Sequence, residues 1–386
     1  MTDTDIKLHY DDIAIVPEVI TNIKSRHECQ PYDENGMLPI FASCMSSVVS
    51  MANYDDFVMA HINPVIPRTY SVKNRLDFMI RHEGIFVAFS LLETHNLFLT
   101  YNENEIGDLF KEAINNTTMH ICIDMANGHM NDLIQTVKLI KQIYGDKVVI
   151  MTGNIANPKT YEEYAKAGVD YARMSIGTGN CCSTSSCTGV HYSVFSLLQE
   201  AYQIKVNNGY KCKIVADGGI RSYRDIQKAL IYADYVMIGS LFNKAIESAG
   251  KTTYGKSYFN IRGFKIFRPI KTLFTFGRQV KIKKLYNQKF YEKIKSGKIE
   301  VNKEVFGMST KKAQSQINEA NGIGTVGKLK TSEGLIKKQM VEFNLKEWAK
   351  EETDYLKSAM SYTNSRTLEE YHNSNWIRIS QIKYNI

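Results

Sequence analysis

The 386-residue chain contains no apolar run long enough to cross a membrane, which takes about 20 consecutive, mainly apolar residues. Its first residues, Met-Thr-Asp-Thr-Asp, have neither the basic nor the apolar part of a signal peptide. Its seven cysteines show no Cys-x-x-Cys spacing. That pattern favours reduced thiols over a disulfide framework or a zinc site. We therefore expect a cytoplasmic protein without a membrane partner.

The chain also lacks the Gly-x-Gly-x-x-Gly turn that an open, doubly wound sheet would place near its first strand. Instead, short apolar runs alternate with segments whose apolar residues recur at helical spacing, which is typical of repeated βα units. The predicted strands are 38–44, 64–68, 85–90, 120–124, 147–152, 171–176, 213–216 and 235–238. The predicted helices include 130–144, 161–167, 193–206 and 223–232. Eight units predict an α/β fold, the (β/α)8 or TIM barrel.

Basic residues are concentrated in one segment. Residues 251–305 hold 15 Lys and Arg against 3 Asp and Glu, a net charge of +12 in a chain whose total is +8. We predict one barrel formed by 1–250 and 306–386, with a basic, aromatic-containing insertion at 251–305 after strand eight and a C-terminal extension. Interleaved aromatic and basic residues allow nucleic-acid binding through this insertion. A solvated surface segment is the interpretation that we favour.

Two segments carry chemistry-bearing residues where a barrel places its active site, at the C-terminal ends of the strands. The first, Ser175-Ile-Gly-Thr-Gly-Asn-Cys-Cys182, follows strand six, and its glycines permit the left-handed turns that expose a thiol. The second, Asp217-Gly-Gly219, follows strand seven, and Gly239-Ser240 follows strand eight. Such glycine turns let a phosphate approach backbone amides. The two segments indicate covalent chemistry on a nucleotide.

Further pieces occur in the order found in one enzyme family. They are Tyr10-Asp11-Asp12 with Val16-Pro17, 124–128, Gly153-Asn154, 237–240, 306–309 and 332–334. With them the chain resembles the inosine monophosphate dehydrogenase and guanosine monophosphate reductase family, whose signature runs Gly-x-Gly-Ser-x-Cys-x-Thr and later Asp-Gly-Gly. The resemblance spans most of the chain except 251–305.

The resemblance implies which residues carry the reaction. Cys182 aligns with the family nucleophile, which attacks purine C2 and forms a covalent thioimidate. Thr184 and Glu333 align with the reductase pair that protonates departing ammonia. By themselves, Cys182 could be a buried apolar residue and Glu333 a solvated carboxylate. The backbone carbonyls of Gly177, Gly179 and Cys182 would hold a monovalent cation, K+.

The resemblance also implies binding residues. Asp217 would accept hydrogen bonds from the ribose hydroxyls. Asp124 and Asn154 would contact the nicotinamide side of NADPH, although an acidic strand-end residue such as Asp124 could instead cap a helix. The other substrate-binding positions are Met45, Arg173, Asn180, Gly218, Gly219, Gly239, Ser240, Gly307, Met308 and Ser309.

Some positions depart from the family pattern. Asn180 replaces a serine, Phe306 a tyrosine and Ser46 an aspartate, and each replacement removes or alters a nucleotide contact. Phe306 in particular has no hydroxyl to donate.

Two further features distinguish the branches of the family. Residues 310–331 contain no arginine, whereas the dehydrogenase branch uses a flap arginine to activate water. Arg173 points the other way, because reductases tend to have lysine there.

We therefore expect a GMP reductase-like oxidoreductase that converts GMP, or a related deoxy or base-modified guanine nucleotide, to IMP and ammonia with NADPH. IMP dehydrogenase, which forms XMP with NAD, is the alternative within the family. A catalytically retired barrel that binds nucleotide or nucleic acid is the alternative outside it. The resemblance further implies a homo-oligomer, a tetramer.

Overall fold

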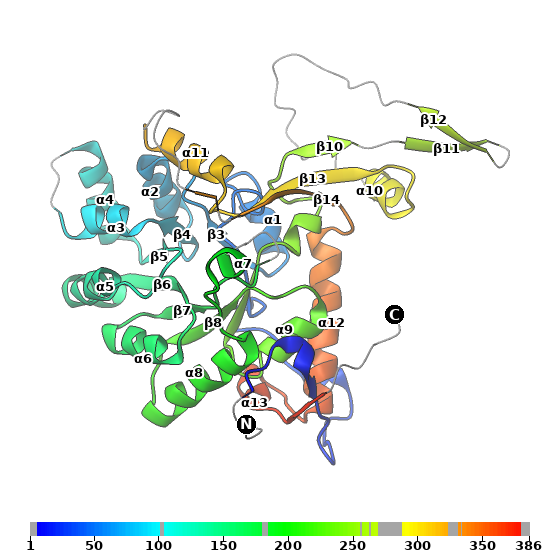
Figure 1. Cartoon of the computed structure of the whole chain (residues 1–386), viewed down its shortest axis with the longest axis horizontal. Helices are drawn as coiled ribbons and strands as arrows, with labels where there is room; N and C mark the ends of the chain where they lie inside the picture. Colours follow the sequence, from blue (N-terminus) through cyan, green and yellow to red (C-terminus); the bar gives the residue numbers. More distant parts are fainter. Residues whose placement is uncertain are drawn as a thin grey trace.

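The computed structural model describes residues 6–100, 104–179, 184–254, 257–261, 264–268, 288–322, 331–332 and 334–379. Eight parallel strands close into a barrel with helices around it (Figure 1). The strands are β2 (Ile40–Ala42), β3 (Asn63–Ile66), β4 (Phe86–Phe89), β5 (Met119–Asp124), β6 (Val148–Ile155), β7 (Tyr171–Met174), β8 (Lys213–Asp217) and β9 (Tyr235–Ile238). Pairing of β9 with β2 closes the barrel, so the predicted fold class is confirmed.

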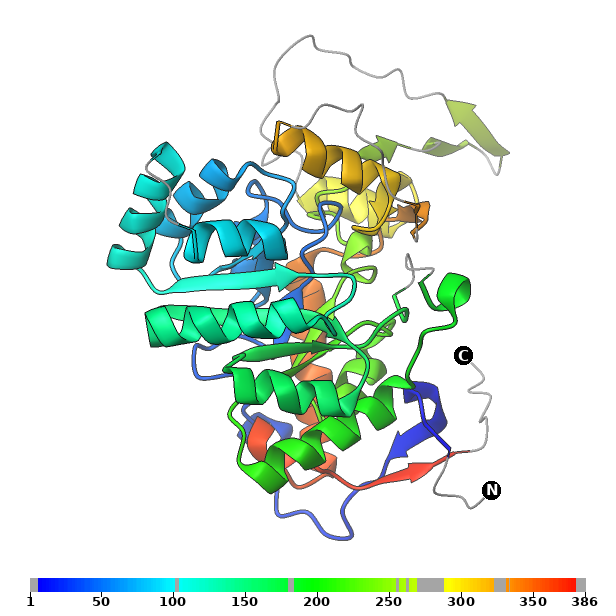
Figure 2. The same cartoon turned by 60° about the vertical axis from the view of Figure 1, so that its left-hand side comes forward.

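The helices between these strands form the outer layer (Figure 2). They are α1 (Tyr54–Met59), α2 (Val72–Arg81), α3 (Leu91–Phe98), α4 (Glu105–Asn116), α5 (Asn131–Tyr144), α6 (Pro158–Ala167), α8 (Val194–Asn208) and α9 (Tyr223–Ala229). The predicted elements differ from these bounds by a few residues, because the ends of elements depend on turns and caps more than on apolar period.

Local signals fix where several helices begin and end. Helix α3 starts with a capping box in which the Ser90 hydroxyl accepts from the Glu93 amide and the Glu93 carboxylate accepts from the Ser90 amide. Helix α6 has Asn157 as its cap and proline at its first position, and it ends at Gly168 with a φ of 90°. These caps fix where α3 begins and where α6 begins and ends.

An aromatic layer fills the N-terminal end of the barrel. Phe86, Tyr171 and Tyr235 each begin a strand and point inward around Phe41, with ring centroids 5.0 to 5.8 Å from it. Because these rings close that end, the open space of the barrel lies at the opposite, C-terminal end of the strands.

The eighth strand and its helix are separated by a long excursion. Helix α12 (Leu345–Tyr362) packs next to α9 and α1, with buried Trp348 against Phe242 and Tyr223. Between β9 and α12 come β10 (Thr252–Tyr254), β13 (Val301–Phe306) and β14 (Ile336–Met340), which form a three-stranded antiparallel sheet. A hairpin of β11 (Ser257–Ile261) and β12 (Phe264–Arg268) extends beyond that sheet at the upper right of Figure 1.

The C-terminal third of the predicted insertion packs on the rest of the protein. On α10 (Gln288–Lys295), the Tyr291 hydroxyl donates to Glu347 at 3.0 Å. Ile294 lies in an apolar cluster with Ile246 and Val341. The basic segment therefore includes a packed part, and its assignment as an insertion at 251–305 stays a proposal.

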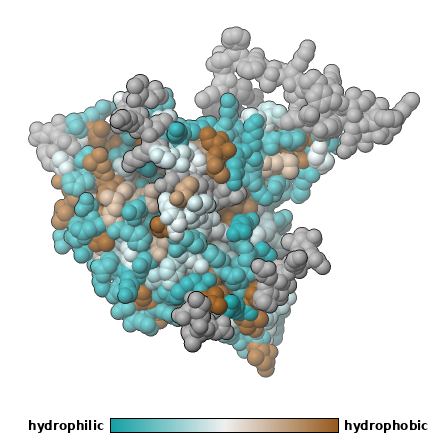
Figure 3. Space-filling model, in the orientation of Figure 1, coloured by the Kyte–Doolittle hydropathy of each residue, from teal (hydrophilic) through white to brown (hydrophobic). Residues whose placement is uncertain are grey.

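The remaining described elements tie the ends of the chain together and complete the surface. Strand β1 (Ile13–Ile15) pairs antiparallel with β15 (Trp376–Arg378), next to α13 (Leu368–Tyr371). On the face shown in Figure 3, hydrophilic residues cover most of the described surface and apolar residues lie in small separate groups. Among the described residues, no helix has the length and apolar character needed to span a membrane.

Candidate active site

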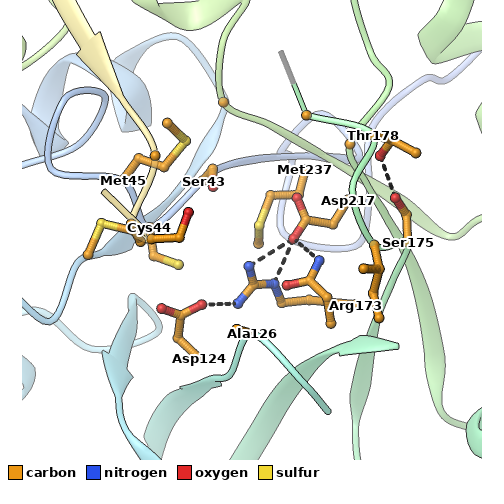
Figure 4. A pocket seen from close by; sticks show the side chains of 18 of the residues that line it. Ser43, Cys44, Met45, Asp124, Ala126, Arg173, Ser175, Thr178, Asp217 and Met237 are labelled. Atoms are coloured by element: carbon orange, nitrogen blue, oxygen red, sulfur yellow. Dashed lines mark hydrogen bonds and ion pairs between the residues drawn. The ribbon is translucent and has the colours of Figure 1, made fainter. Parts of the chain in front are cut away.

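A pocket of about 250 Å³ lies at the C-terminal ends of the barrel strands (Figure 4). It is lined by every predicted site residue that the structure describes. These are Met45, Asp124, Asn154, Arg173, Gly177, Gly179, Thr184, Asp217, Gly218, Gly219, Gly239, Ser240, Gly307, Met308 and Ser309. The predicted positions Asn180, Cys182 and Glu333 lie outside the described residues. Residues from seven separate chain segments thus meet in one place, while their individual roles stay predictions.

Arg173 on β7 holds the two acidic residues of the pocket. Its Nη1 lies 2.9 Å from Oδ1 of Asp124, and its Nη2 lies 2.8 Å from Oδ2 of Asp217. Its Nε also donates to Oδ2 of Asp217, as does the Asn154 amide at 2.8 Å. Among the described residues, no hydrogen bond reaches the second oxygen, Oδ1 of Asp217. That oxygen is available to a ligand in the pocket.

A second arginine stabilises the charge of Asp124. The Nε of Arg68, just past the end of β3, lies 3.3 Å from Oδ2 of Asp124. Burial by itself raises the pKa of Asp124, but the charges of Arg173 and Arg68 outweigh it and hold that pKa below its ordinary value. Asp124 is therefore an anion that positions two arginines, and no helix-capping role is needed to explain it.

The turns after β8 and β9 provide free backbone donors. Gly218 and Gly219 have φ angles of 123° and 76°, which glycine adopts readily. The N–H groups of Gly218, Gly219 and Ser240 donate to no acceptor within the described part of the chain. A Cβ on Gly239 would come within 2.7 Å of the Met45 sulfur, so this turn also needs a residue without a side chain. Unpaired amides in glycine turns suit an anion such as phosphate.

Both ends of the predicted cysteine loop lie in the pocket wall. Gly179 precedes the undescribed stretch, Thr184 follows it at the start of α7 (Thr184–Thr188), and both line the cavity. Gly177 takes the predicted positive φ, 76°. Its carbonyl accepts a hydrogen bond from the Ser185 hydroxyl at 2.9 Å, so one of the three carbonyls predicted to bind K+ already has a partner.

Two of the residues that depart from the family pattern, Ser46 and Phe306, contact other described residues. The Ser46 hydroxyl donates to the Gln316 side chain at 2.8 Å, which connects the loop after β2 to α11 (Lys311–Ala320). Phe306 is buried at the end of β13, and the Lys312 amine lies 4.9 Å from the centre of its ring. Phe306 itself does not line the pocket, although the next three residues do.

Sequence reasoning missed part of the pocket wall. The additional lining residues are Ser43, Cys44, Arg68, Met125, Ala126, Ser175, Ile176, Thr178, Ile220 and Met237. Most are neighbours of predicted residues at strand ends, and that adjacency was the available signal. Arg68 ended a predicted strand and could have been chosen on the same ground as Asp124.

Five of the seven cysteines lie among the described residues. Cys29, Cys44, Cys122 and Cys212 are buried and Cys187 is exposed, and all five are free. No group of three or more His, Cys, Asp and Glu side chains suited to a metal ion occurs among the described residues.

Comparison with known proteins agrees with the site. The sequence model of the IMP dehydrogenase / GMP reductase domain matches residues 103–298, half of the chain. The chain belongs to this family. It is 31% identical to the GMP reductase of Staphylococcus epidermidis over 264 residues, which cover 64% of this chain and 75% of that enzyme. It is 31% identical to the GMP reductase of Bacillus licheniformis, with 63% and 73% covered, and 28% identical to that of Vibrio vulnificus, with 68% and 76% covered.

These relatives support the GMP reductase branch of the family for this chain, and with it an oxidoreductase of that type. The predicted family and enzyme class are therefore confirmed. Family membership also implies a nicotinamide cofactor and a purine nucleotide monophosphate as substrate.

Proposed function

We propose that the protein reduces GMP to IMP and ammonia with NADPH, through a covalent bond between Cys182 and purine C2. The observation that carries this proposal is the meeting, in one pocket, of unpaired phosphate-binding amides, the Arg173–Asp217 pair and both ends of the cysteine loop. The named GMP reductases among the relatives support the same reaction.

The nucleotide is bound by residues from two sides of the pocket. Its phosphate lies on the amides of Gly218, Gly219 and Ser240, where the donors are already oriented and unpaired. Asp217 accepts a ribose hydroxyl at Oδ1, because Oδ2 is occupied by Arg173 and Asn154. We predicted that Asp217 binds both ribose hydroxyls. Among the described residues only its Oδ1 has no hydrogen-bond partner, so we now propose Oδ1 as the atom that accepts from the ribose.

Cys182 and Thr184 act on purine C2. The Cys182 thiolate adds to C2, and the 2-amino group leaves as ammonia after Thr184, assisted by Glu333, passes it a proton. The product of this step is a thioimidate between Cys182 and the purine. After hydride addition at C2, the C–S bond breaks, the thiolate is restored and IMP is released.

Residues next to Asp124 would hold the nicotinamide end of the cofactor. Met45, Met125 and Ala126 offer apolar surface there, and Arg68 adds a positive charge. NADPH, when bound, supplies the hydride for C2. Asp124 and Asn154 position this side of the site through Arg173 and Asp217.

The described neighbours of Glu333 favour its role. Ile336 pairs with Phe306 in the β13–β14 ladder, and Gly307 next to Phe306 lines the pocket. Glu333 precedes Ile336 by three positions, which span at most about 10 Å in an extended chain. This short sequence distance supports the assignment of Glu333 to the active site.

The K+ site, the tetramer and the cytoplasmic location stay predictions. A cation on the carbonyls of Gly177, Gly179 and Cys182 has to share the Gly177 oxygen with Ser185.

Turnover of the purified protein with GMP and NADPH tests the function, followed by loss of NADPH absorbance and by release of ammonia. We expect one ammonia and one IMP per NADPH consumed. The reverse-direction assay with IMP and NAD is the control for the dehydrogenase alternative, to which Arg173 points. XMP formation from IMP and NAD, with no oxidation of NADPH by GMP, would contradict the proposal.

A further inference from the structure

Two hydroxyl groups that the reaction does not use lie together on the wall of the pocket. The Ser175 Oγ, directly after β7, lies 2.5 Å from the Thr178 Oγ1 (Figure 4). Both residues line the pocket. Hydrogen bonding between two hydroxyls uses one hydrogen, so the pair retains one hydrogen that it can donate to a third group.

The backbone at Ser175 is one that glycine would adopt more easily. Its φ is 116°, in the left-handed half of conformational space where a Cβ is unfavourable. Ser175 is also 1% exposed, so its hydroxyl depends on Thr178 as its hydrogen-bond partner. Strained residues of this kind persist where a side chain has a function, and the only group that serine adds over glycine is this hydroxymethyl.

The hydroxyl pair lies directly against the predicted phosphate turn. A Cβ placed on Gly218 would collide with the Thr178 hydroxyl and would come within 3.3 Å of the Ser175 hydroxyl. The unpaired amides of Gly218 and Gly219 belong to the same turn. Hydroxyl and amide donors therefore converge on one region of the pocket.

We propose that Ser175 and Thr178 form a further phosphate-binding subsite, in which the pair donates its remaining hydrogen to the 5′-phosphate of the nucleotide. The subsite supplies a hydroxyl donor to the nucleotide, which Phe306, buried and without a hydroxyl, cannot supply in place of the family tyrosine. This inference rests on the proposed function only in taking a nucleoside monophosphate as the ligand. It makes Thr178 and Ser175 residues that select a phosphorylated nucleoside over the free nucleoside.

Direct binding, measured by calorimetry without cofactor, tests the subsite separately from turnover. The ligands are GMP, guanosine and inorganic phosphate. The variants are Thr178→Val, which keeps the shape and removes the donor, and Ser175→Gly, which removes the hydroxyl and the strained Cβ. Thr353→Val on α12 is the matched control, because among the described residues its hydroxyl bonds only the Ala349 carbonyl of its own helix.

We expect Thr178→Val and Ser175→Gly each to weaken GMP and phosphate binding about tenfold or more, with guanosine affinity unchanged within about twofold. Ser175→Gly should also raise the thermal midpoint, because the strain is relieved, which a purely structural serine would not do. An unchanged ratio of GMP to guanosine affinity in both variants would overturn the subsite, as would a wild-type protein that binds GMP no better than guanosine. If GMP binds with the expected dependence on Thr178 but is not reduced by NADPH, the proposed function fails while the subsite stands.

Discussion

Replacing Arg173 by methionine should destabilise the barrel strongly, because one side chain neutralises two buried carboxylates. Arg173 is 4% exposed, and it lies within 2.9 Å of both Asp124 and Asp217. Removing one partner of a buried ion pair costs about 3 to 5 kcal/mol in free energy of unfolding. Arg68 still faces Asp124, so we expect a loss of about 3 kcal/mol, near the lower end of that range.

Arg173→Lys separates charge from geometry. Lysine keeps the positive charge, but a single ammonium cannot reproduce the two-sided contacts of the guanidinium fork. We expect it to cost about 1 to 2 kcal/mol, roughly the value of one or two lost hydrogen bonds to charged groups. The result also tests whether the lysine typical of reductases is tolerated in this pocket.

The dependence on pH gives a second signature. The pKa of Asp124 is held low in the wild type, so its ion pairs contribute stability above the unfolded pKa of about 3.9, and this contribution is lost as the pH falls through the lower folded pKa. Without Arg173, burial raises that pKa, and the folded variant takes up a proton more readily. The stability gap between wild type and Arg173→Met should therefore narrow as the pH falls from about 7 toward about 4.

Urea unfolding followed by tryptophan fluorescence measures these differences. Arg26→Met is the matched control, because Arg26 lies 3.7 Å from Asp354 on the surface, where such pairs contribute about 0 to 1 kcal/mol. If Arg173→Met lies within about 1 kcal/mol of the wild type, or equals Arg173→Lys at every pH, the account of the two-carboxylate bridge is wrong.

Three further predictions concern other parts of the chain. Burial raises the pKa of Glu247 from 4.5 to about 7, so the contribution of Glu247 to wild-type stability should fall as the pH rises between those values. In Glu247→Gln this pH-dependent loss, at most about 3 kcal/mol in free energy of unfolding, should disappear. Glu342→Gln, at an exposed position, should keep it. Urea unfolding over that pH range measures both variants. Deleting 257–287 removes eight Lys and Arg and no acidic residue. Because these positive charges would attract the phosphorylated cofactor, the shortened enzyme should still fold, but its KM for the cofactor should rise and depend less on salt. An unchanged KM with lost binding to single-stranded nucleic acid would instead support a nucleic-acid role. Glu333→Gln should slow ammonia release more than hydride transfer to the preformed intermediate in rapid-mixing assays, and equal losses would make Glu333 a positioning residue.

Much of the fold could be predicted because its signals are local. Each barrel strand is a short apolar run, and each neighbouring helix repeats apolar residues at helical spacing, so counting units was enough. Parallel strands bring their C-terminal ends to one side, so residues at strand ends, such as Asp124 and Asp217, were expected together. The structure places both on the same arginine.

Contacts between distant segments could not be predicted in this way. The pairing of Arg68 with Asp124 and the contact of Thr178 with Gly218 depend on how neighbouring strands are rotated and how far each loop reaches. The packing of α10 through Tyr291 was hidden by composition, because the lysines around it suggested a fully solvated segment. Charged residues indicate which face of α10 lies in solvent, but they do not show that the opposite face of this amphipathic helix is buried.

The central claim is that Cys182 becomes covalently bonded to the purine, and peptide mass spectrometry of acid-quenched turnover mixtures tests it most directly. Cys181, Cys182 and Cys187 fall on one tryptic peptide, so single substitutions must assign the adduct. We predict that the purine adduct and turnover persist in Cys181→Ser and Cys187→Ser, and that both disappear in Cys182→Ala while GMP still binds. Turnover of Cys182→Ala within about tenfold of the wild type, or an adduct lost only in Cys181→Ser, would contradict the account.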